Sequence, residues 1–479
     1  MKNIALPFPF PLRLFGCLLC LSIWSGNLSA QHTVSGFTPA KEKTMVENPV
    51  PFSQRWLKIK SNEGKVFRFA PVVEKTNHRL EFRKRFKTGE GRIFPANILD
   101  YANIYQVDGG SLVTFRLGSP GAKALRLKLS EVDLPEGAQM LVYAASNSTN
   151  IDGPFINRGA NDNRIIWTKN LPGEEIIVEC FLPGNSTEKI NAYFKLSELA
   201  HIYADPLQKS TQWQREQAAA LCNVEVPAEW KEAAKSVAEI QFSSAGYIYS
   251  CSATLLNTAN NTGTPYLLTA NHCVNRQSEA DSLQTIWFKD SPTSTGQYGT
   301  SNAELVATGL AGDFTLLKLR GALPAGVRFS GWTAEQPAPE TAVTGIHHPQ
   351  DSYKRIAFGK TIASTCPPEL LQEACDSFQS VRWAQGITEP GSSGSGLLVG
   401  AASDPKLTGT LTGGSSACAN PQGEGVYGQL SAYFPAIEYY LTGITKLVRQ
   451  SNLWALVPMK QPSILLSQAL GPVAGAQKA

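Results

Sequence analysis

The chain has 479 residues, of which 42% are apolar and 17% are charged. This length and composition argue against a disordered chain and allow two or three domains with proper hydrophobic cores. The 43 basic and 39 acidic residues leave a net charge of only +4, which is too small and too mixed to mark a nucleic-acid-binding protein. The 40 glycines and 30 prolines favour β structure rich in turns.

The N-terminal segment, residues 1–30, is typical of a secretory signal peptide. It has a basic start, an apolar stretch over Leu14–Trp24 and small residues ending at Ala30. One alternative is a membrane anchor, but the apolar stretch is shorter than the roughly 20 residues that span a bilayer. A lipid anchor on Cys17 is another. The sequence thus predicts a secreted protein, extracellular or periplasmic, with no membrane span in its mature form and with disulfides permitted.

Seven cysteines remain once the signal peptide is removed. Six of them follow residue 220 and allow 15 pairings, among which spacing alone cannot choose. The seventh, Cys180, lies in an apolar, strand-like run and is predicted to be a buried, unreactive thiol. No Cys-x-x-Cys motif or close Cys/His cluster is present in the mature chain, so we predict no metal site and no cofactor.

The first half of the mature chain has the pattern of a β-sandwich. From 45 to 203, short alternating runs such as Leu125–Leu129 are separated by Gly, Pro, Asn and Asp clusters. Residues 204–221 follow as a polar stretch with Lys209 and Arg215, which is typical of an exposed linker open to cleavage. We therefore predict a pro-domain or accessory domain over 45–203 and a linker over 204–221.

A second β-rich region, 222–442, carries the residues with chemical potential. A helix is predicted over Tyr433–Leu441 at its end, despite Pro435 near its start. Residues 443–479 form a C-terminal tail without a recognisable motif.

Three segments of this region each present one reactive group. His272 ends the buried run Pro265–Cys273, Asp313 precedes the apolar run Phe314–Leu319, and Ser393 lies in the turn Thr388–Leu397. Taken singly, such a histidine, aspartate or serine is more often structural than catalytic. Together they supply the hydroxyl, the imidazole and the carboxylate that acyl transfer by serine requires.

The order of the three groups discriminates between protease and lipase classes. His272, Asp313 and Ser393 are separated by 41 and 80 residues, and this order is that of chymotrypsin-type enzymes. The lipase motif Gly-x-Ser-x-Gly fails around Ser393 because position 395 is serine. A lipase is thereby disfavoured.

The motifs Thr-Ala-Asn-His-Cys, Asp-Phe-Thr-Leu-Leu-Lys-Leu and Thr-Glu-Pro-Gly-Ser-Ser-Gly-Ser resemble those of the bacterial lysyl endopeptidases, over about residues 222–440. The resemblance implies an all-β fold, a chymotrypsin-like double β-barrel, preceded here by the β-sandwich. It also implies a serine endopeptidase acting on protein or peptide substrates, with Ser393 as nucleophile, His272 as base and Asp313 as the carboxylate that orients the base.

The resemblance implies further roles as well. The backbone N–H groups of Gly391 and Ser393 would form the oxyanion hole, and His347 and His348 would be structural. The implied disulfides are Cys251–Cys273 and Cys222–Cys418, which leaves Cys366 and Cys375 to each other.

Substrate preference is where this sequence departs from the family. The predicted substrate-binding residues are Ile387, Thr412, Gly413 and Gly425. Gly425 stands where the family has the aspartate that anchors lysine, and Thr412 replaces a family histidine, while Ile387 predicts an apolar pocket floor. Glu424, next to Gly425, points to the opposite face of a strand and is a doubtful substitute. The lysine anchor is therefore missing, and the preferred residue before the cut stays open.

The residue before the nucleophile bears on how the protease would be activated. In trypsin-like zymogens, the amino terminus that cleavage creates pairs with an aspartate immediately before the nucleophile. Ser392 occupies that position and carries no charge, so this activation mechanism is excluded. We hypothesise instead that the sandwich is a pro-region released by cleavage in the linker. The alternative is a retained accessory domain.

The chain could also be a non-catalytic cell-surface binding protein on a protease-like scaffold, or an enzyme that cleaves small esters. The oligomeric state is open.

Overall fold

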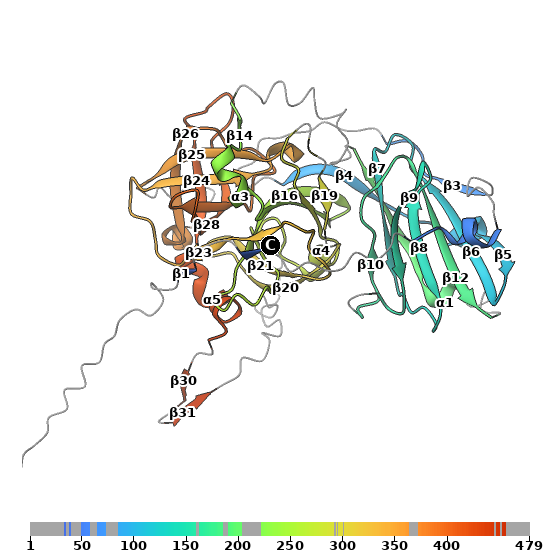
Figure 1. Cartoon of the computed structure of the whole chain (residues 1–479). Coiled ribbons are helices and arrows are strands. Elements are labelled where there is room, and N and C mark those ends of the chain that lie inside the picture. The colour runs from blue at the N-terminus through green and yellow to red at the C-terminus, as the bar shows by residue number, and fades with distance from the viewer. Residues whose placement is uncertain are drawn as a thin grey trace, which may run out of the picture.

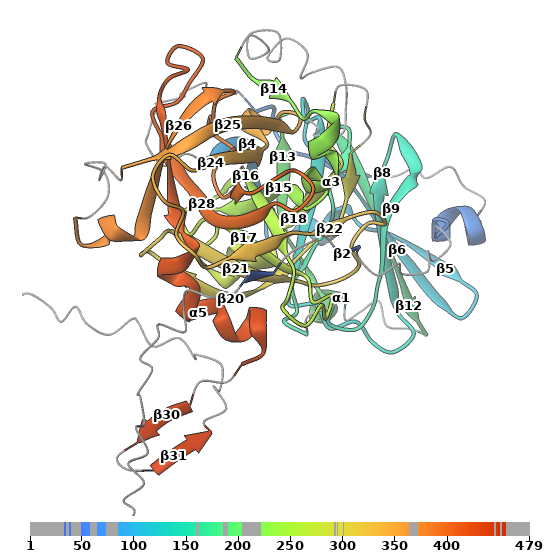
Figure 2. The same cartoon turned by 60° about the vertical axis from the view of Figure 1, so that its left-hand side comes forward.

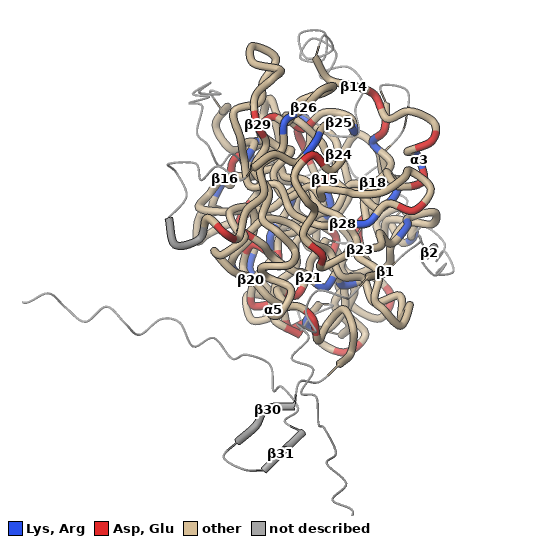
Figure 3. The backbone as a smooth tube through the Cα atoms, turned by 90° about the vertical axis from the view of Figure 1, so that its left-hand side faces the viewer, with Lys and Arg blue, Asp and Glu red and all other residues tan. Residues whose placement is uncertain are grey.

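The computed structural model describes residues 33–34, 38–39, 49–57, 65–72, 85–159, 162–184, 190–203, 222–291, 294, 296–299, 301–363, 372–444, 447–450 and 453–456. The chain forms a β-sandwich beside two β-barrels (Figures 1 and 2). The predicted signal peptide and linker lie outside the described residues. In the part of the chain that is described, no helix is long and apolar enough to cross a membrane. Basic and acidic residues are interspersed along the fold (Figure 3), as expected from the small net charge.

The N-terminal region consists of two packed sheets. The first contains β3 (Val66–Arg68), β5 (Asn103–Val107), β6 (Gly110–Gly118), β8 (Gln139–Ala144), β9 (Asn147–Phe155) and β12 (Glu175–Pro183). The second contains β4 (Phe86–Ile93), β7 (Ala124–Ser130), β10 (Ile166–Trp167), β11 (Leu171–Pro172) and β13 (Lys195–Ile202). Helix α1 (Ile190–Tyr193) precedes β13.

Alternation of apolar residues explains this sandwich. Val113, Phe115 and Leu117 of β6 and the leucines of β7 belong to one buried cluster, because every second side chain of a strand faces the same side. Cys180 of β12 lies in the same cluster, and burial raises the pKa of its thiol to about 12. The predicted burial of Cys180 is therefore confirmed, and its lack of reactivity stays a prediction.

The first barrel is a half-barrel built around one meandering sheet. Its strands are β15 (Val237–Ser244), β16 (Tyr247–Leu256), β17 (Tyr266–Thr269), β18 (Gln284–Trp287), β19 (Gln297–Tyr298), β20 (Ala303–Gly309) and β21 (Phe314–Leu319). Helices α3 (Lys231–Ala234) and α4 (Gln277–Asp281) precede β15 and β18.

The second barrel is closed. Strands β24 (Ala342–His347), β25 (Arg355–Ile362), β26 (Phe378–Gln385), β29 (Glu424–Gln429), β28 (Lys406–Gly414) and β27 (Gly396–Val399) pair in that order, and β27 returns to β24. With the sandwich, the two barrels confirm the predicted fold class.

Several short elements join these units. Strands β1 (Thr33–Val34), β14 (Val224–Glu225) and β23 (Gly331–Thr333) extend the sheet of the second barrel, while β2 (Thr38–Pro39) pairs with β22 (Arg328–Phe329) and β30 (Leu447–Gln450) with β31 (Leu453–Leu456) in separate two-stranded sheets. Single helical turns lie at Ser53–Leu57, Ile98–Tyr101, Ala228–Trp230, Pro349–Asp351 and Gln372–Ser377.

Helix α5 (Leu430–Thr442) confirms the predicted helix and begins earlier than Tyr433. Pro435 is the sixth residue of the helix and lies beyond the four N-terminal positions whose N–H groups have no intrahelical partner, so its ring removes one backbone hydrogen bond from the helix. The helix ends at Gly443, whose φ of 72° gives a left-handed cap.

The sandwich and the half-barrel share one sheet. Strand β4 pairs with β13 on one side and with β16 on the other, with Ile248 opposite Gly89 and Tyr249 opposite Lys87. The pairing of β4 with β16 was not predicted from the sequence, because strand partners that are distant in the chain leave no local pattern.

Candidate active site

His272 and Asp313 come together because their strands are neighbours. His272 follows β17 and Asp313 precedes β21, and these two strands pair antiparallel with Thr269 opposite Thr315. The Asp313 carboxylate contacts the histidine twice: Oδ2 lies 2.7 Å from Nδ1, and Oδ1 accepts the backbone N–H at 2.9 Å. The carbonyl of Asp313 also accepts the N–H of Asn271 at 3.1 Å.

The pair is shielded from water to different degrees. The side chain of Asp313 is 2% exposed and that of His272 is 10% exposed. A buried carboxylate beside Nδ1 favours the tautomer that carries a proton on this nitrogen. The same arrangement stabilises an imidazolium if the ring takes up a second proton.

The turn that carries Ser393 packs against the end of β17. Ser252 holds the turn at two points, since its N–H donates to the carbonyl of Ser393 at 2.8 Å and its Oγ donates to the carbonyl of Gly391 at 2.9 Å. A Cβ on Gly394 would collide with Thr269 Oγ1 and the carbonyl of Ser252. The absence of a side chain at 394 therefore lets the Ser393 turn approach the strand that leads to His272.

A pocket opens beside Ser393 and holds about 340 Å³ of space, part of it open to solvent. The residues that line it are Thr388, Glu389, Pro390, Ser393, Leu411, Gly413, Gly414 and Ser416. Of the four predicted substrate-binding residues, Gly413 lines this pocket. Ile387, Thr412 and Gly425 are buried and are not among the lining residues, so their role stays a prediction.

Two acidic residues near the pocket differ in their partners. Glu424 forms an ion pair with Arg382 on the neighbouring strand at 2.8 Å. Glu389 lines the pocket, and its carboxylate accepts hydrogen bonds from Gln350 Nε2 at 2.9 Å and Asn223 Nδ2 at 3.1 Å. The sequence analysis missed Glu389, although the residue lies inside the motif that includes Ser393.

His347 and His348 lie in the core beside the Ser393 turn. Both are fully buried, and burial is the main cause that lowers the pKa of each imidazole to about 3. Nδ1 of His347 lies 2.8 Å from Ser392 Oγ. Ser392, the residue before Ser393, thus carries no charge and contacts a neutral imidazole.

Two of the three implied disulfides, Cys222–Cys418 and Cys251–Cys273, are present. The second joins the residue after His272 to β16. The predicted partner of Cys375, Cys366, lies outside the described residues. Among the side chains that are described, no group of three His, Cys, Asp or Glu residues is arranged to hold a metal ion.

Comparisons with known proteins give concordant matches. The family model for the lysyl endopeptidase C-terminal domain matches residues 217–428, and the model for the N-terminal domain matches residues 104–203. A lysyl endopeptidase of Pseudomonas aeruginosa is 29% identical over 402 residues, which are 77% of this chain and 84% of the relative.

Solved structures show more distant likeness. An HtrA-type protease with a tripeptide is 18% identical with a TM-score of 0.32, over 44% of this chain and 62% of the other. A thermostable serine protease from an extremophilic microorganism is 16% identical with a TM-score of 0.33, over 44% of this chain and 98% of the other.

The two barrels and the family matches define the class of this protein: it is a serine endopeptidase with a chymotrypsin-like fold. Within that class, the chain is a lysyl endopeptidase-like protease, because the models for both the N-terminal and the C-terminal domain of that family match it. The resemblance predicted from its motifs is therefore confirmed.

Proposed function

We propose that this endopeptidase hydrolyses peptide bonds through Ser393, His272 and Asp313 and an acyl-enzyme intermediate. The observation that carries the proposal is the contact of 2.7 Å between His272 Nδ1 and Asp313 Oδ2. It leaves the other ring nitrogen, Nε2, to act as the base, while the packing of the Ser393 turn against β17 supports the serine as its partner.

In the first half of the reaction, Ser393 Oγ attacks the carbonyl carbon of the scissile bond and passes its proton to His272 Nε2. The tetrahedral intermediate collapses, the bond to nitrogen breaks, and the leaving amine takes the proton from the imidazolium. In the second half, water attacks the acyl-enzyme and passes its proton to His272 Nε2. The bond to Ser393 Oγ then breaks and the serine takes the proton back, which releases the acid and restores the serine. Asp313 keeps its charge and stabilises the imidazolium in both halves.

The oxyanion hole is proposed at the N–H groups of Gly391 and Ser393. Gly391 has a φ of +94°, which favours glycine and turns its peptide unit within the loop. Its N–H donates no backbone hydrogen bond among the described residues, so this donor is available for a developing negative charge. Loss of one such donor typically lowers kcat by about a hundredfold or more.

Labelling with a fluorophosphonate tests the nucleophile. We expect the secreted, processed protein to be labelled, the Ser393→Ala variant to be unlabelled, and Ser395→Ala, a buried serine in the same turn, to keep the label. Equal labelling of Ser393→Ala would contradict the assignment. An unlabelled wild-type protein would favour the non-catalytic scaffold.

We further propose that the protein is secreted and that the sandwich is a pro-region. The sandwich contacts the residue proposed as the base: Arg85, which precedes β4, donates from Nε to the carbonyl of His272. Its guanidinium also lies 3.5 Å from Glu279 Oε1 and over the rings of Phe242 and Tyr249. Release of the sandwich would free this edge of β16, which lies beside the proposed active site.

N-terminal sequencing of the labelled protein from the culture medium tests this second proposal. A start within or just after residues 204–221 is expected. A fully active form that starts at Gln31 would support a retained accessory domain instead, and an active protein found only in the cytoplasmic fraction would contradict secretion.

A further inference from the structure

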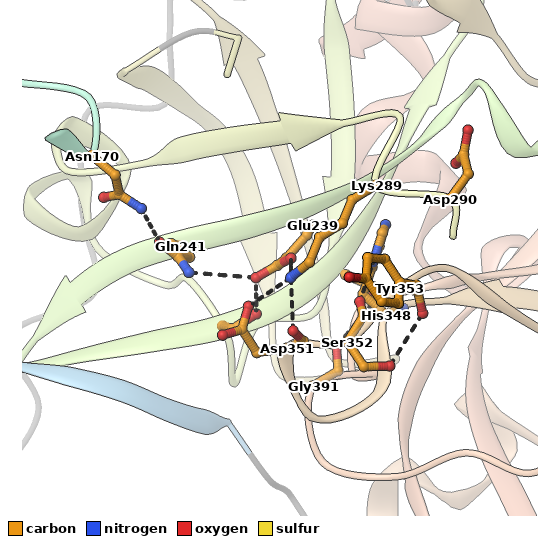
Figure 4. Close-up of polar contacts among 12 residues, drawn as sticks. Asn170, Glu239, Gln241, Lys289, Asp290, His348, Asp351, Ser352, Tyr353 and Gly391 are labelled. Carbon is orange, nitrogen blue, oxygen red and sulfur yellow. Dashed lines mark hydrogen bonds and ion pairs between the residues drawn. The ribbon is translucent and has the colours of Figure 1, made fainter. Parts of the chain in front are cut away.

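A lysine is buried where the two barrels meet, close to the turn that precedes Ser393. Lys289 follows β18, and its side chain is 1% exposed. Its ammonium donates to Glu239 Oε2 at 2.8 Å, to Asp351 Oδ1 at 3.0 Å and to the carbonyl of Asp351 at 2.7 Å (Figure 4). A buried ammonium is costly unless all of its protons are paired, and here all three have acceptors.

The pKa values of the two carboxyl groups in this cluster shift in opposite directions. Burial alone would raise the pKa of Glu239, but the Lys289 ammonium overrides this effect and holds the pKa at about 2. Burial and the negative charge of Glu239 together raise the pKa of Asp351 well above its usual value. The Asp351 carboxyl also shares a side-chain hydrogen bond with Glu239.

Asp351 belongs to a short turn, Pro349–Asp351, with an unusual backbone. Gln350 has a φ of 50° and Asp351 a φ of 58°, a region in which residues other than glycine are strained. Such a conformation persists only when contacts around it determine it. Two contacts of the Lys289 ammonium, to the carbonyl and the carboxyl of Asp351, supply that restraint.

The strained turn in turn contacts the Ser393 turn. The N–H of Gln350 donates to the carbonyl of Pro390 at 2.6 Å. A Cβ on Gly391 would lie 2.9 Å from Gln350 N and 2.9 Å from the carbonyl of His348, so the two backbones are in direct contact. A shift of residues 350 and 351 would therefore move the peptide units of Pro390 and Gly391.

We propose that Lys289 is a positioning residue, which clamps Asp351 so that the Pro349–Asp351 turn holds Pro390 and Gly391 in the geometry of the oxyanion hole. This inference rests on the function proposed above. The ammonium does not touch the substrate. It acts through the Pro349–Asp351 turn, which contacts the Ser393 turn at Pro390 and Gly391.

The chain offers a matched control for this role. Lys354 is also 1% exposed, and its ammonium donates to the carbonyl of Ala234 at 2.7 Å and forms an ion pair with Asp290 at 2.8 Å. Neither of these partners belongs to the Pro349–Asp351 turn or to the Ser393 turn. Lys289→Met and Lys354→Met thus each remove one buried ammonium. Only the Lys289 ammonium contacts the turn that holds the proposed oxyanion hole.

The experiment measures kcat and KM on a peptide amide, the affinity for a peptidyl boronate, and thermal unfolding for both variants in the processed enzyme. For Lys289→Met we expect kcat to fall about tenfold or more at a temperature well below unfolding. KM should stay within about threefold, and boronate affinity should fall in parallel with kcat, since the boronate occupies the oxyanion hole. For Lys354→Met we expect kcat to stay within about threefold.

Two results would overturn the inference: a Lys289→Met enzyme with kcat within threefold of wild type, or losses of kcat in both variants that follow only their unfolding temperatures. If Lys289→Met does not fold, Lys289→Met/Glu239→Gln, which removes the Lys289–Glu239 ion pair as a whole, takes its place. Failure of that variant to fold as well would make Lys289 a residue of global folding and reject the positioning role. A wild-type enzyme without fluorophosphonate labelling would instead reject the proposed function.

Discussion

Asp313 contacts His272 through both carboxylate oxygens, one at the ring Nδ1 and one at the backbone N–H, at 2.7 and 2.9 Å. The first contact selects the tautomer and the second fixes the ring relative to its own backbone. A side chain that does both cannot be replaced by its amide without loss, because an amide presents a donor where an acceptor is needed.

Asp313→Asn is therefore expected to lower kcat by about 10⁴-fold, as the wrong imidazole tautomer does in serine protease triads, with a small change in unfolding temperature. Steady-state kinetics on a peptide amide measure the effect. Asp281→Asn is the matched control, because Asp281 is also buried and accepts hydrogen bonds from the amides of Gln277 and Asn163. We expect its kcat to stay within threefold, and a fall of less than tenfold in Asp313→Asn would contradict the assigned role.

Gly394→Ala is expected to misplace the Ser393 turn. The added Cβ would collide with Thr269 and Ser252 at a backbone φ of +84°. Gly400→Ala shares the strain, with a φ of +93°, but its Cβ would meet no atom closer than the Asp404 carbonyl at 3.2 Å. Left-handed strain costs about 1–2 kcal/mol, and overpacking adds about 1–3 kcal/mol.

Urea unfolding and kcat of the two alanine variants separate strain from collision. We expect Gly400→Ala to lose only the strain energy and to keep its activity, while Gly394→Ala loses more stability and most of its kcat. Equal losses in the two variants would show that the close approach at Gly394 does not position Ser393.

Stability should fall in acid because His347 and His348 are buried as neutral rings. Their pKa values are about 3 in the folded protein and about 6.5 in an unfolded chain. Between these values the unfolded state binds more protons, so the free energy of unfolding decreases as the pH is lowered from about 6.5 towards 3. Each histidine contributes a slope of about 1.4 kcal/mol per pH unit.

Asp351 opposes the histidines within this range, because its raised pKa lets the folded state bind a proton at a pH where the unfolded carboxyl is still ionised. The lowered pKa of Glu239 adds to the acid loss below about pH 4.5. Urea unfolding of the phosphonate-inhibited enzyme at pH 7, 6, 5 and 4 measures the slope without self-digestion. His347→Asn should reduce the slope by about one proton, and a stability independent of pH over this range would contradict neutral burial.

Local patterns in the sequence determined a large part of the fold. Alternating apolar residues in β6 and β7 predicted a sandwich, because a strand buries every second side chain wherever it finds its partner. The apolar spacing before Gly443 predicted α5 for a similar reason. The motifs around His272, Asp313 and Ser393 predicted the chemistry, because each motif combines a reactive group with the turn or strand that presents it.

The sequence by itself thus determined the class of structure and, through family resemblance, two disulfides, and it predicted the three reactive groups. Only the tertiary structure decided that β4 joins β16, that Glu389 lines the pocket and that Lys289 meets Asp351. These contacts join residues far apart in the chain, and their energies depend on burial and on the distance between charges. Neither the burial nor these distances are defined until the two barrels have folded around these residues.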